Sequence, residues 1–89
     1  MDFEWDEEKC LINMRKHGVD FVDVPSVFDT DVVTVEDDRY NYGEQRFVTF
    51  GLLNGREIAV VHTDDGNLIR IISARRATKH ERRNYFEQV

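Results

Sequence analysis

Cysteine is almost missing from this chain, since Cys10 is the single one among 89 residues. A lone cysteine excludes a disulfide within the chain and a zinc site built from several thiolates, which fits a reducing compartment. No apolar run approaches the roughly 18 residues that a membrane-spanning helix needs, and no signal peptide is recognisable. We therefore expect neither export nor a membrane span, and a cytoplasmic location.

Cofactor motifs are missing as well. The five glycines form neither a phosphate-binding P-loop nor a dinucleotide-binding pattern. The three histidines, His17, His62 and His80, lack the spacing of a metal site. We expect no metal and no cofactor.

Repeats, linkers and low-complexity tracts do not occur either. The 89 residues predict one domain, 1–89, at the lower edge of the size that folds alone. A hydrophobic content of 40% supports a packed core and argues against disorder. The stability of so small a core is modest, so a bound partner or oligomerisation would add to it.

Charged side chains are numerous and are unevenly distributed along the chain. Residues 1–45 hold thirteen acidic and four basic side chains, whereas residues 46–89 hold five acidic and eight basic ones. The whole chain has a formal net charge of −6, so its basic end stands out. This asymmetry favours one surface for a polyanion and another for a cationic partner or solvent. For the acidic half, solubility alone is an equally good explanation.

Helix signals mark the first third of the chain. Asp6 is a suitable N-cap, acids follow it, and Lys16-His17-Gly18 supplies cations and a glycine at the end, which predicts a helix over 6–17. The spacing of Phe21, Val24 and Phe28 predicts a short second helix over 20–28. Pro25 suits that helix only in its first turn.

Strand signals follow. We expect a short strand over 32–35, a polar loop over 36–44, and then an antiparallel meander of strands over 46–53, 56–63 and 68–73. Asn54-Gly55 is a strong two-residue hairpin turn, and residues 64–67 form the second turn. Thr78 and Glu81 form a capping box that predicts a helix from about Lys79 to Gln88. The order indicates an α+β fold with helices on one face of a four-stranded, mainly antiparallel sheet.

The two turns also predict which side chains share a face of the sheet. With Leu53 opposite Arg56, and Thr63 opposite Leu68, Val61 faces Arg70. One face then carries Arg46, Val48, Phe50, Leu52, Ala59, Val61, Thr63, Leu68, Arg70 and Ile72. The other carries Phe47, Thr49, Gly51, Ile58, Val60, His62, Ile69, Ile71 and Ser73.

The polar residues on these faces have structural as well as functional interpretations. Arg46 and Arg70 either form ion pairs with Glu44, Glu57 or a helix acid, or clamp a phosphate. For His62 we favour a hydrogen bond to a backbone group or to Ser73 over catalysis. A role at a helix C-terminus accounts for His17, because its charge is favourable there by about 0.3–1 kcal/mol.

Residues near the C-terminus also have a structural and a functional interpretation. Arg75 and Arg76 lie in the expected connector between the last strand and helix, where neither is needed for folding, so we favour a functional role. Tyr85 and Phe86 are expected core contacts of the terminal helix. Lys79, Arg82 and Arg83 fit a solvated helix face equally well.

Both ends of the chain and its middle carry residues of a known family signature. The opening carries Phe3-Glu-Trp-Asp6, Asn13, Lys16-His-Gly-Val19, Phe21 and Val27-Phe28. The closing stretch, which is the more specific, reads Arg70-Ile-Ile-Ser-Ala-Arg-Arg-Ala-Thr78, followed by Glu81-Arg-Arg and Tyr85. Gly43-Glu44-x-Arg46 and Gly51 match the middle. In these stretches the chain resembles the BrnT toxins. It departs from that family in the second hairpin, which reads Asp64-Asp65-Gly66 where members often have an arginine just before the glycine.

The resemblance implies a RelE-like fold and the toxin half of a bacterial type II toxin–antitoxin pair. It implies RNA cleavage without a required metal, inhibition of translation, and neutralisation by a BrnA-type antitoxin. Operator DNA would be bound only through the antitoxin. The alternative is a weak or inactive domain that pairs with its antitoxin and modulates repression of its operon.

Metal-free cleavage by attack of the 2′-OH needs a base, an acid, and cations for the phosphorane. Under this hypothesis Arg75 and Arg46 stabilise transition-state charge, His17 or His62 transfers protons, and Tyr85 is an auxiliary donor. The residues expected to bind RNA are Arg70, Arg76, Lys79, Arg82 and Arg83.

Overall fold

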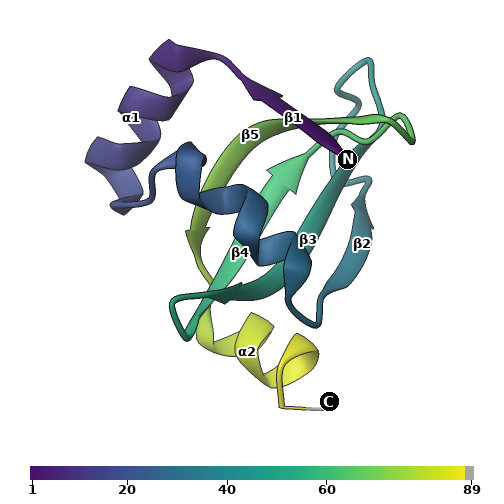
Figure 1. Cartoon of the computed structure of the whole chain (residues 1–89). Coiled ribbons are helices and arrows are strands. Elements are labelled where there is room, and N and C mark those ends of the chain that lie inside the picture. The colour runs from purple at the N-terminus through teal and green to yellow at the C-terminus, as the bar shows by residue number, and fades with distance from the viewer. Residues whose placement is uncertain (88–89) are drawn as a thin grey trace.

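The chain folds as a mixed five-stranded sheet with helical segments on both faces (Figure 1). The computed structural model describes residues 1–87. The elements are β1 (Asp2–Trp5), α1 (Glu7–His17), η1 (Phe21–Asp29), β2 (Val33–Asp37), β3 (Arg46–Leu53), β4 (Arg56–His62), β5 (Leu68–Arg76) and α2 (Lys79–Tyr85). The strand order is β1-β5-β4-β3-β2, so the α+β class is confirmed. The predicted end of the last helix at Gln88 lies outside the described residues.

Strand β1 was not predicted, and the four-stranded sheet is therefore wrong. Residues 2–5 pair in parallel with β5, where Phe3 lies beside Ile69 and Trp5 beside Ile71. The pairing joins segments more than sixty residues apart, so no local turn signal announces it. The other strand pairs are antiparallel.

The first helix forms as its capping signals predict. The Asp6 carboxylate accepts hydrogen bonds from the backbone N–H of Glu8 and Lys9, at 2.9 and 3.1 Å. Gly18 ends the helix with φ of 72°, a left-handed conformation that glycine adopts without strain. The second predicted helix is η1, a 3₁₀ segment that contains Pro25 within it rather than in a first α-helical turn.

Asn13 attaches α1 to the sheet. Its amide donates to the carbonyls of Val19 and Ala74, both at 2.9 Å, and its oxygen accepts from the Ala74 N–H at 3.1 Å. The side chain thus pairs with the backbone of β5 beyond the point where β1 ends at Trp5. Asn13 is 4% exposed, so these hydrogen bonds are protected from water.

The first hairpin has the predicted register and the second does not. Leu53 lies opposite Arg56 and Val48 opposite Val61, with Asn54 and Gly55 at φ of 51° and 76° as a type I′ turn requires. In the second hairpin a bulge places His62 opposite Ile71 and Val61 opposite Ser73. The predicted pairing of Val61 with Arg70 is wrong for two reasons. The turn is longer than predicted, which shifts the pairing by two residues at His62, and the bulge then adds one residue and exchanges the faces of the side chains beyond it.

Three residues near the bulge or beyond it have surroundings that differ from the prediction. Strand β5 continues to Arg76, so Arg75 and Arg76 lie in a strand rather than a connector. Arg75 shares a face with Ala59, whereas Arg76 shares the opposite face with Ile58. Ser73 lies with Val61 and not on the face of His62, where it was expected.

Two faces of the sheet are therefore distinct. The helical face packs under α1 and η1 and holds the larger core, Phe21, Val24, Val27, Ile58, Val60, Ile69, Ile71 and Ala74. Its packing is so close that a Cβ on Gly51 would lie 2.7 Å from Val27 Cγ1. The opposite face, which we call the arginine face, holds a smaller cluster in which Tyr85 and Phe86 pack against Val48, Phe50 and Ala59. The expectation that all helices cover one face is wrong, because α2 packs on the other.

No helix within residues 1–87 is long and apolar enough to cross a membrane.

Candidate active site

Arg46 and Arg70 on the arginine face are joined by one carboxylate. Arg46 Nε donates to Glu44 Oε2 at 3.0 Å, and Arg70 Nη2 donates to both oxygens of Glu44 at 2.7 and 2.6 Å. The hydrogen bonds from Arg70, and then those from Arg46, lower the pKa of Glu44. The predicted ion pairs with Glu44 are confirmed, and two guanidinium groups share one negative charge.

Arg75 is held by a second carboxylate on the same face. Its Nη1 and Nη2 donate to the two oxygens of Glu81 at 2.7 and 3.0 Å. Glu81 also completes the predicted capping box, since its Oε1 accepts from the Thr78 N–H at 2.9 Å and its own N–H donates to Thr78 Oγ1 at 3.1 Å. The hydrogen bonds from Arg75 are the main reason why the pKa of Glu81 falls to about 2. The start of α2 thereby fixes the orientation of Arg75.

A groove of about 240 Å³ lies beside Arg75, between α2 and strands β2 and β3. Tyr85 lines it with its ring stacked on Phe50, the centroids 4.1 Å apart and the planes at 7°. Across the groove Arg39 forms two hydrogen bonds with Asp37, at 2.8 and 3.1 Å. The groove therefore combines guanidinium groups, a phenol and an aromatic floor.

His62 is remote from this groove. It is 1% exposed and lies on the helical face, where its ring contacts Phe28 edge to face at 5.2 Å between centroids. Its Nδ1 donates to the Thr63 carbonyl at 3.0 Å, since a carbonyl only accepts, and its Nε2 accepts from Thr49 Oγ1 at 2.6 Å. Burial lowers its pKa, which favours the neutral ring. The predicted backbone hydrogen bond is confirmed, whereas Ser73 as a partner is wrong.

His17 lies at the end of α1, beside the edge of the sheet. It lines a cavity of about 310 Å³ together with Arg56 and Arg76. Burial lowers its pKa, and the positive charges of Lys16 and Arg75 lower it further. The expected benefit of a charged His17 at the helix end is therefore outweighed, and the neutral ring is favoured.

The residues predicted to bind RNA do not form one surface. Arg70 lies on the arginine face, but Arg76 is exposed on the helical face. On α2, Lys79 and Arg83 are exposed, and Arg82 Nη1 donates to the Ala77 carbonyl at 3.3 Å. Of the residues predicted to bind RNA, Arg70 therefore lies on the arginine face, and Lys79, Arg82 and Arg83 belong to α2, which packs on that face.

Two residues that line the groove, His80 and Arg39, were not predicted as site residues. His80 follows the Thr78 cap by two residues, in the first turn of α2. This position was the sequence feature that could have identified it as a site residue. Its Nε2 accepts from the Asn84 amide at 2.8 Å. Arg39 lies in the predicted loop, and nothing in its local sequence indicates that Asp37 would aim it at the groove.

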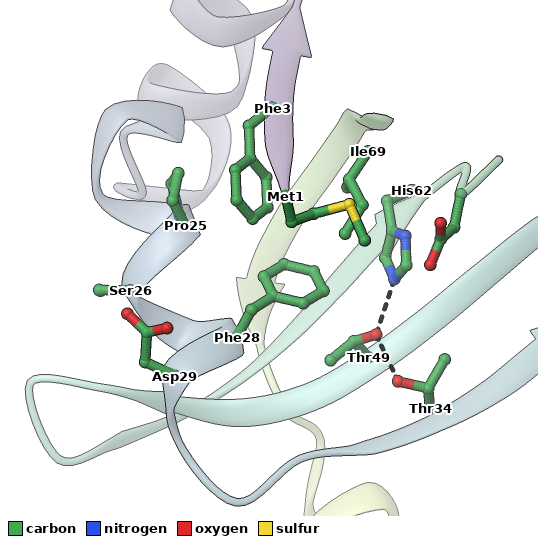
Figure 2. Close-up of a pocket in the computed structure, with 11 residues that line it drawn as sticks. Met1, Phe3, Pro25, Ser26, Phe28, Asp29, Thr34, Thr49, His62 and Ile69 are labelled. Atoms are coloured by element: carbon green, nitrogen blue, oxygen red, sulfur yellow. Dashed lines mark hydrogen bonds between the residues drawn. The ribbon is translucent and has the colours of Figure 1, made fainter. Parts of the chain in front are cut away.

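A third cavity, larger than the groove beside Arg75 and the cavity beside His17, lies on the helical face. Its volume is about 560 Å³, and it opens between β1, η1 and the strands below (Figure 2). His62 and Thr49 lie at its floor, with Thr34 Oγ1 hydrogen-bonded to Thr49 Oγ1 at 2.8 Å. This cavity and the groove beside Arg75 are thus on opposite faces of the sheet.

Comparison with known proteins gives one family. The model of BrnT, described as the ribonuclease toxin of a type II toxin–antitoxin system, matches residues 5–81. No curated protein matches the chain. The matched range includes Arg46, Arg70, Arg75 and Glu81, which the fold gathers on or beside the arginine face. The chain belongs to the BrnT family of type II toxin–antitoxin ribonuclease toxins.

Proposed function

We propose that this chain is a metal-independent endoribonuclease that inhibits translation by cleaving RNA on its arginine face. The observation that carries the proposal is the common face of Arg46, Arg70 and Arg75, with Tyr85 in the same groove as Arg75. Three guanidinium groups on one side of a small sheet suit a phosphodiester, because their planar forks match its oxygens. A BrnA-type antitoxin neutralises the toxin, and operator DNA is bound through that antitoxin.

The reaction is a transesterification. The 2′-oxygen attacks the adjacent phosphorus and loses its proton to a base, and a bond from phosphorus to the 2′-oxygen forms. The bond from phosphorus to the 5′-oxygen breaks, and an acid protonates that oxygen. The products are a 2′,3′-cyclic phosphate and a 5′-hydroxyl, with no redox change and no added co-reactant.

Arg75 is the residue proposed to stabilise the phosphorane. Its bidentate contact with Glu81 fixes the guanidinium before substrate arrives, which is the condition under which electrostatic stabilisation is largest. Glu81 itself is a poor base, because a pKa of about 2 leaves its carboxylate with little affinity for a proton. Its role is to position Arg75, while Arg46 and Arg70 bind flanking phosphates.

The group that transfers protons is proposed from its position relative to Arg75. Burial and both hydrogen bonds of His62 remove it from this role, and it lies on the other face. His80 lines the groove beside Arg75, and His17 lies at the sheet edge with a lowered pKa. We propose His80 as the principal acid–base group, with His17 as its rival and Tyr85 as an auxiliary donor.

The test is cleavage of a labelled single-stranded RNA by the purified chain in EDTA. Wild type should produce 2′,3′-cyclic phosphate ends, and Arg75→Ala should be about 10²–10³-fold slower. Arg15→Ala is the matched control, because Arg15 is exposed on α1 and away from the groove. Equal rates for Arg75→Ala and wild type would refute the assignment.

A second function has support from one observation. Among the described residues, every guanidinium that lies at the groove or shares Glu44 is paired with a carboxylate, and the chain carries −6 overall. Pairing reduces the attraction to phosphate, as a binding module without strong catalysis would show. Growth separates the two functions, because an active nuclease expressed without antitoxin arrests cells and an antitoxin-binding module in autorepression does not.

A further inference from the structure

The cavity on the helical face has the size of a binding site and no role in the proposed cleavage. Its volume of about 560 Å³ falls within the roughly 300–1,000 Å³ of typical ligand pockets. It opens on the side of the sheet away from Arg75, because its floor residue His62 lies under η1 (Figure 2). Its size therefore permits a partner side chain to enter it.

The interior of this cavity is suited to an apolar side chain. Phe3 and Phe28 form one wall, with ring centroids 5.3 Å apart, and Ile69 lines another part. The polar groups at the floor are already satisfied, since Thr34, Thr49 and His62 form a continuous chain of hydrogen bonds. Across the described residues, no buried side-chain nitrogen or oxygen is without a hydrogen-bond partner. The interior therefore requires no polar ligand.

The side chains that carry charge at the rim of the cavity are acidic. Asp29 and Asp64 are exposed residues that line it, and its described lining includes no lysine or arginine, although Met1 with its terminal amino group lines it too. The ion pairs found within residues 1–87 use Asp37, Glu44 and Glu81, so neither rim carboxylate has a basic partner among them. Such a rim repels nucleic acid and attracts a cationic segment.

We infer that this cavity is the docking site for a basic segment of the antitoxin. The segment inserts one apolar or aromatic side chain beside Phe3 and Phe28, and places lysine or arginine on Asp29 and Asp64. The occupant is a protein because the family consists of type II toxins, and it is basic because the rim is acidic. The inference rests on the antitoxin partner of the proposed function and names the surface that this partner would use, but it depends on neither RNA cleavage nor any residue of the arginine face.

Charge reversal tests the rim. Affinity for the purified antitoxin is measured by biolayer interferometry with the full chain, at several salt concentrations. Asp29→Lys with Asp64→Lys should weaken binding by about ten- to a hundredfold, because like charges then face each other. The control is Glu8→Lys with Asp23→Lys, which makes the same change in net charge at exposed acids outside the cavity lining and should bind within about twofold of wild type.

Filling the cavity tests its interior. Thr34 is exposed on β2 and lines the cavity, so Thr34→Trp places an indole in it, whereas Thr34→Val removes the hydroxyl without filling it. Thr34→Trp should lose at least about tenfold in affinity, and Thr34→Val should stay near wild type. Circular dichroism and a cooperative thermal transition establish that each variant is folded.

Hydrogen exchange of the complex locates the partner directly. Protection by the antitoxin is expected over residues 25–34 and 62–69. Wild-type affinity in both the charge-reversed and the Thr34→Trp variants overturns the inference. Protection confined to the arginine face or to α1 overturns it as well. Failure of wild type to bind the antitoxin overturns the proposed partner and the docking site together, whereas the proposal of RNA cleavage would stand on the cleavage assay.

Discussion

Arg75 and Glu81 form a two-point ion pair, at 2.7 and 3.0 Å, across the junction between the last strand and the last helix. The same Glu81 carboxylate caps α2 through the Thr78 N–H at 2.9 Å. One side chain thus determines where the helix starts and how the proposed catalytic guanidinium points. The two roles are separable by mutation, because glutamine keeps the cap but not the charge.

Glu81→Gln should lower kcat/KM for RNA cleavage while leaving α2 in place. A misplaced catalytic group costs up to about 10²-fold, so a loss of about ten- to a hundredfold is expected. Thr78→Ala is the control, since it removes the hydroxyl cap at a cost of about 1 kcal/mol in unfolding free energy but leaves the contact with Arg75. Steady-state kinetics and urea unfolding of both variants make the comparison. Equal losses of activity in the two would show that Glu81 acts only on the helix.

Asn13 is expected to be a major stabilising residue. Asn13→Ala removes three hydrogen bonds and leaves the buried N–H and C=O of Ala74 without partners. Each orphaned group costs about 1–3 kcal/mol, so a loss of about 2–5 kcal/mol in unfolding free energy is expected. Urea denaturation measures it. Asn41→Ala, which removes one exposed contact with the Gly43 N–H, is the control and should change stability by less than about 1 kcal/mol.

These residues also show how far sequence reasoning reaches. Asp6, Gly18, Asn54-Gly55 and the Thr78–Glu81 box act within a few residues of themselves, and the elements they predict are confirmed. Asn13 belongs to the opening that resembles the BrnT family. Its hydrogen bonds to Ala74 were not predictable, because Ala74 lies sixty-one residues away. Strand β1 was missed for the same reason, because its partner β5 is equally distant.

The bulge near Ile72 had the largest effect on the site. Alternation of side chains predicts faces correctly up to a bulge and wrongly after it, so Ser73 was misplaced beside His62. The ion pairs of Glu44 with Arg46 on β3 and with Arg70, which precedes the bulge on β5, were predicted correctly, because that prediction rested on chemical type and on no pairing beyond the bulge. His80 and Arg39 were missed because the groove exists only when α2 and β2 come together.

Buried His62 should make the protein less stable in mild acid. Burial lowers its pKa in the folded state below the ordinary value of 6.5, so the unfolded chain binds the proton more readily. The stabilising contribution of neutral His62 is therefore present above about pH 6.5 and is lost as pH falls below that value. Urea midpoints at pH 7.5 and 5.5 measure this loss. His62→Gln, which cannot titrate, should show a smaller change between the two pH values, and an identical change would exclude His62 as the source.

The pH dependence of cleavage should decide between the two remaining histidines. If His80 transfers the proton, His80→Ala should lower kcat by about 10²–10⁴-fold and remove one limb of the pH profile of kcat/KM. His17→Ala should then leave that limb in place, because His17 lines a different cavity from Arg75. The opposite result, with the limb lost in His17→Ala, would move the acid–base role to the edge of the sheet. There, burial, Lys16 and Arg75 already lower the pKa of His17, and the limb should appear below pH 6.5.

His80→Gln with added imidazole is the rescue experiment, since recovery of rate requires that a missing proton carrier, and not a disturbed α2, caused the loss.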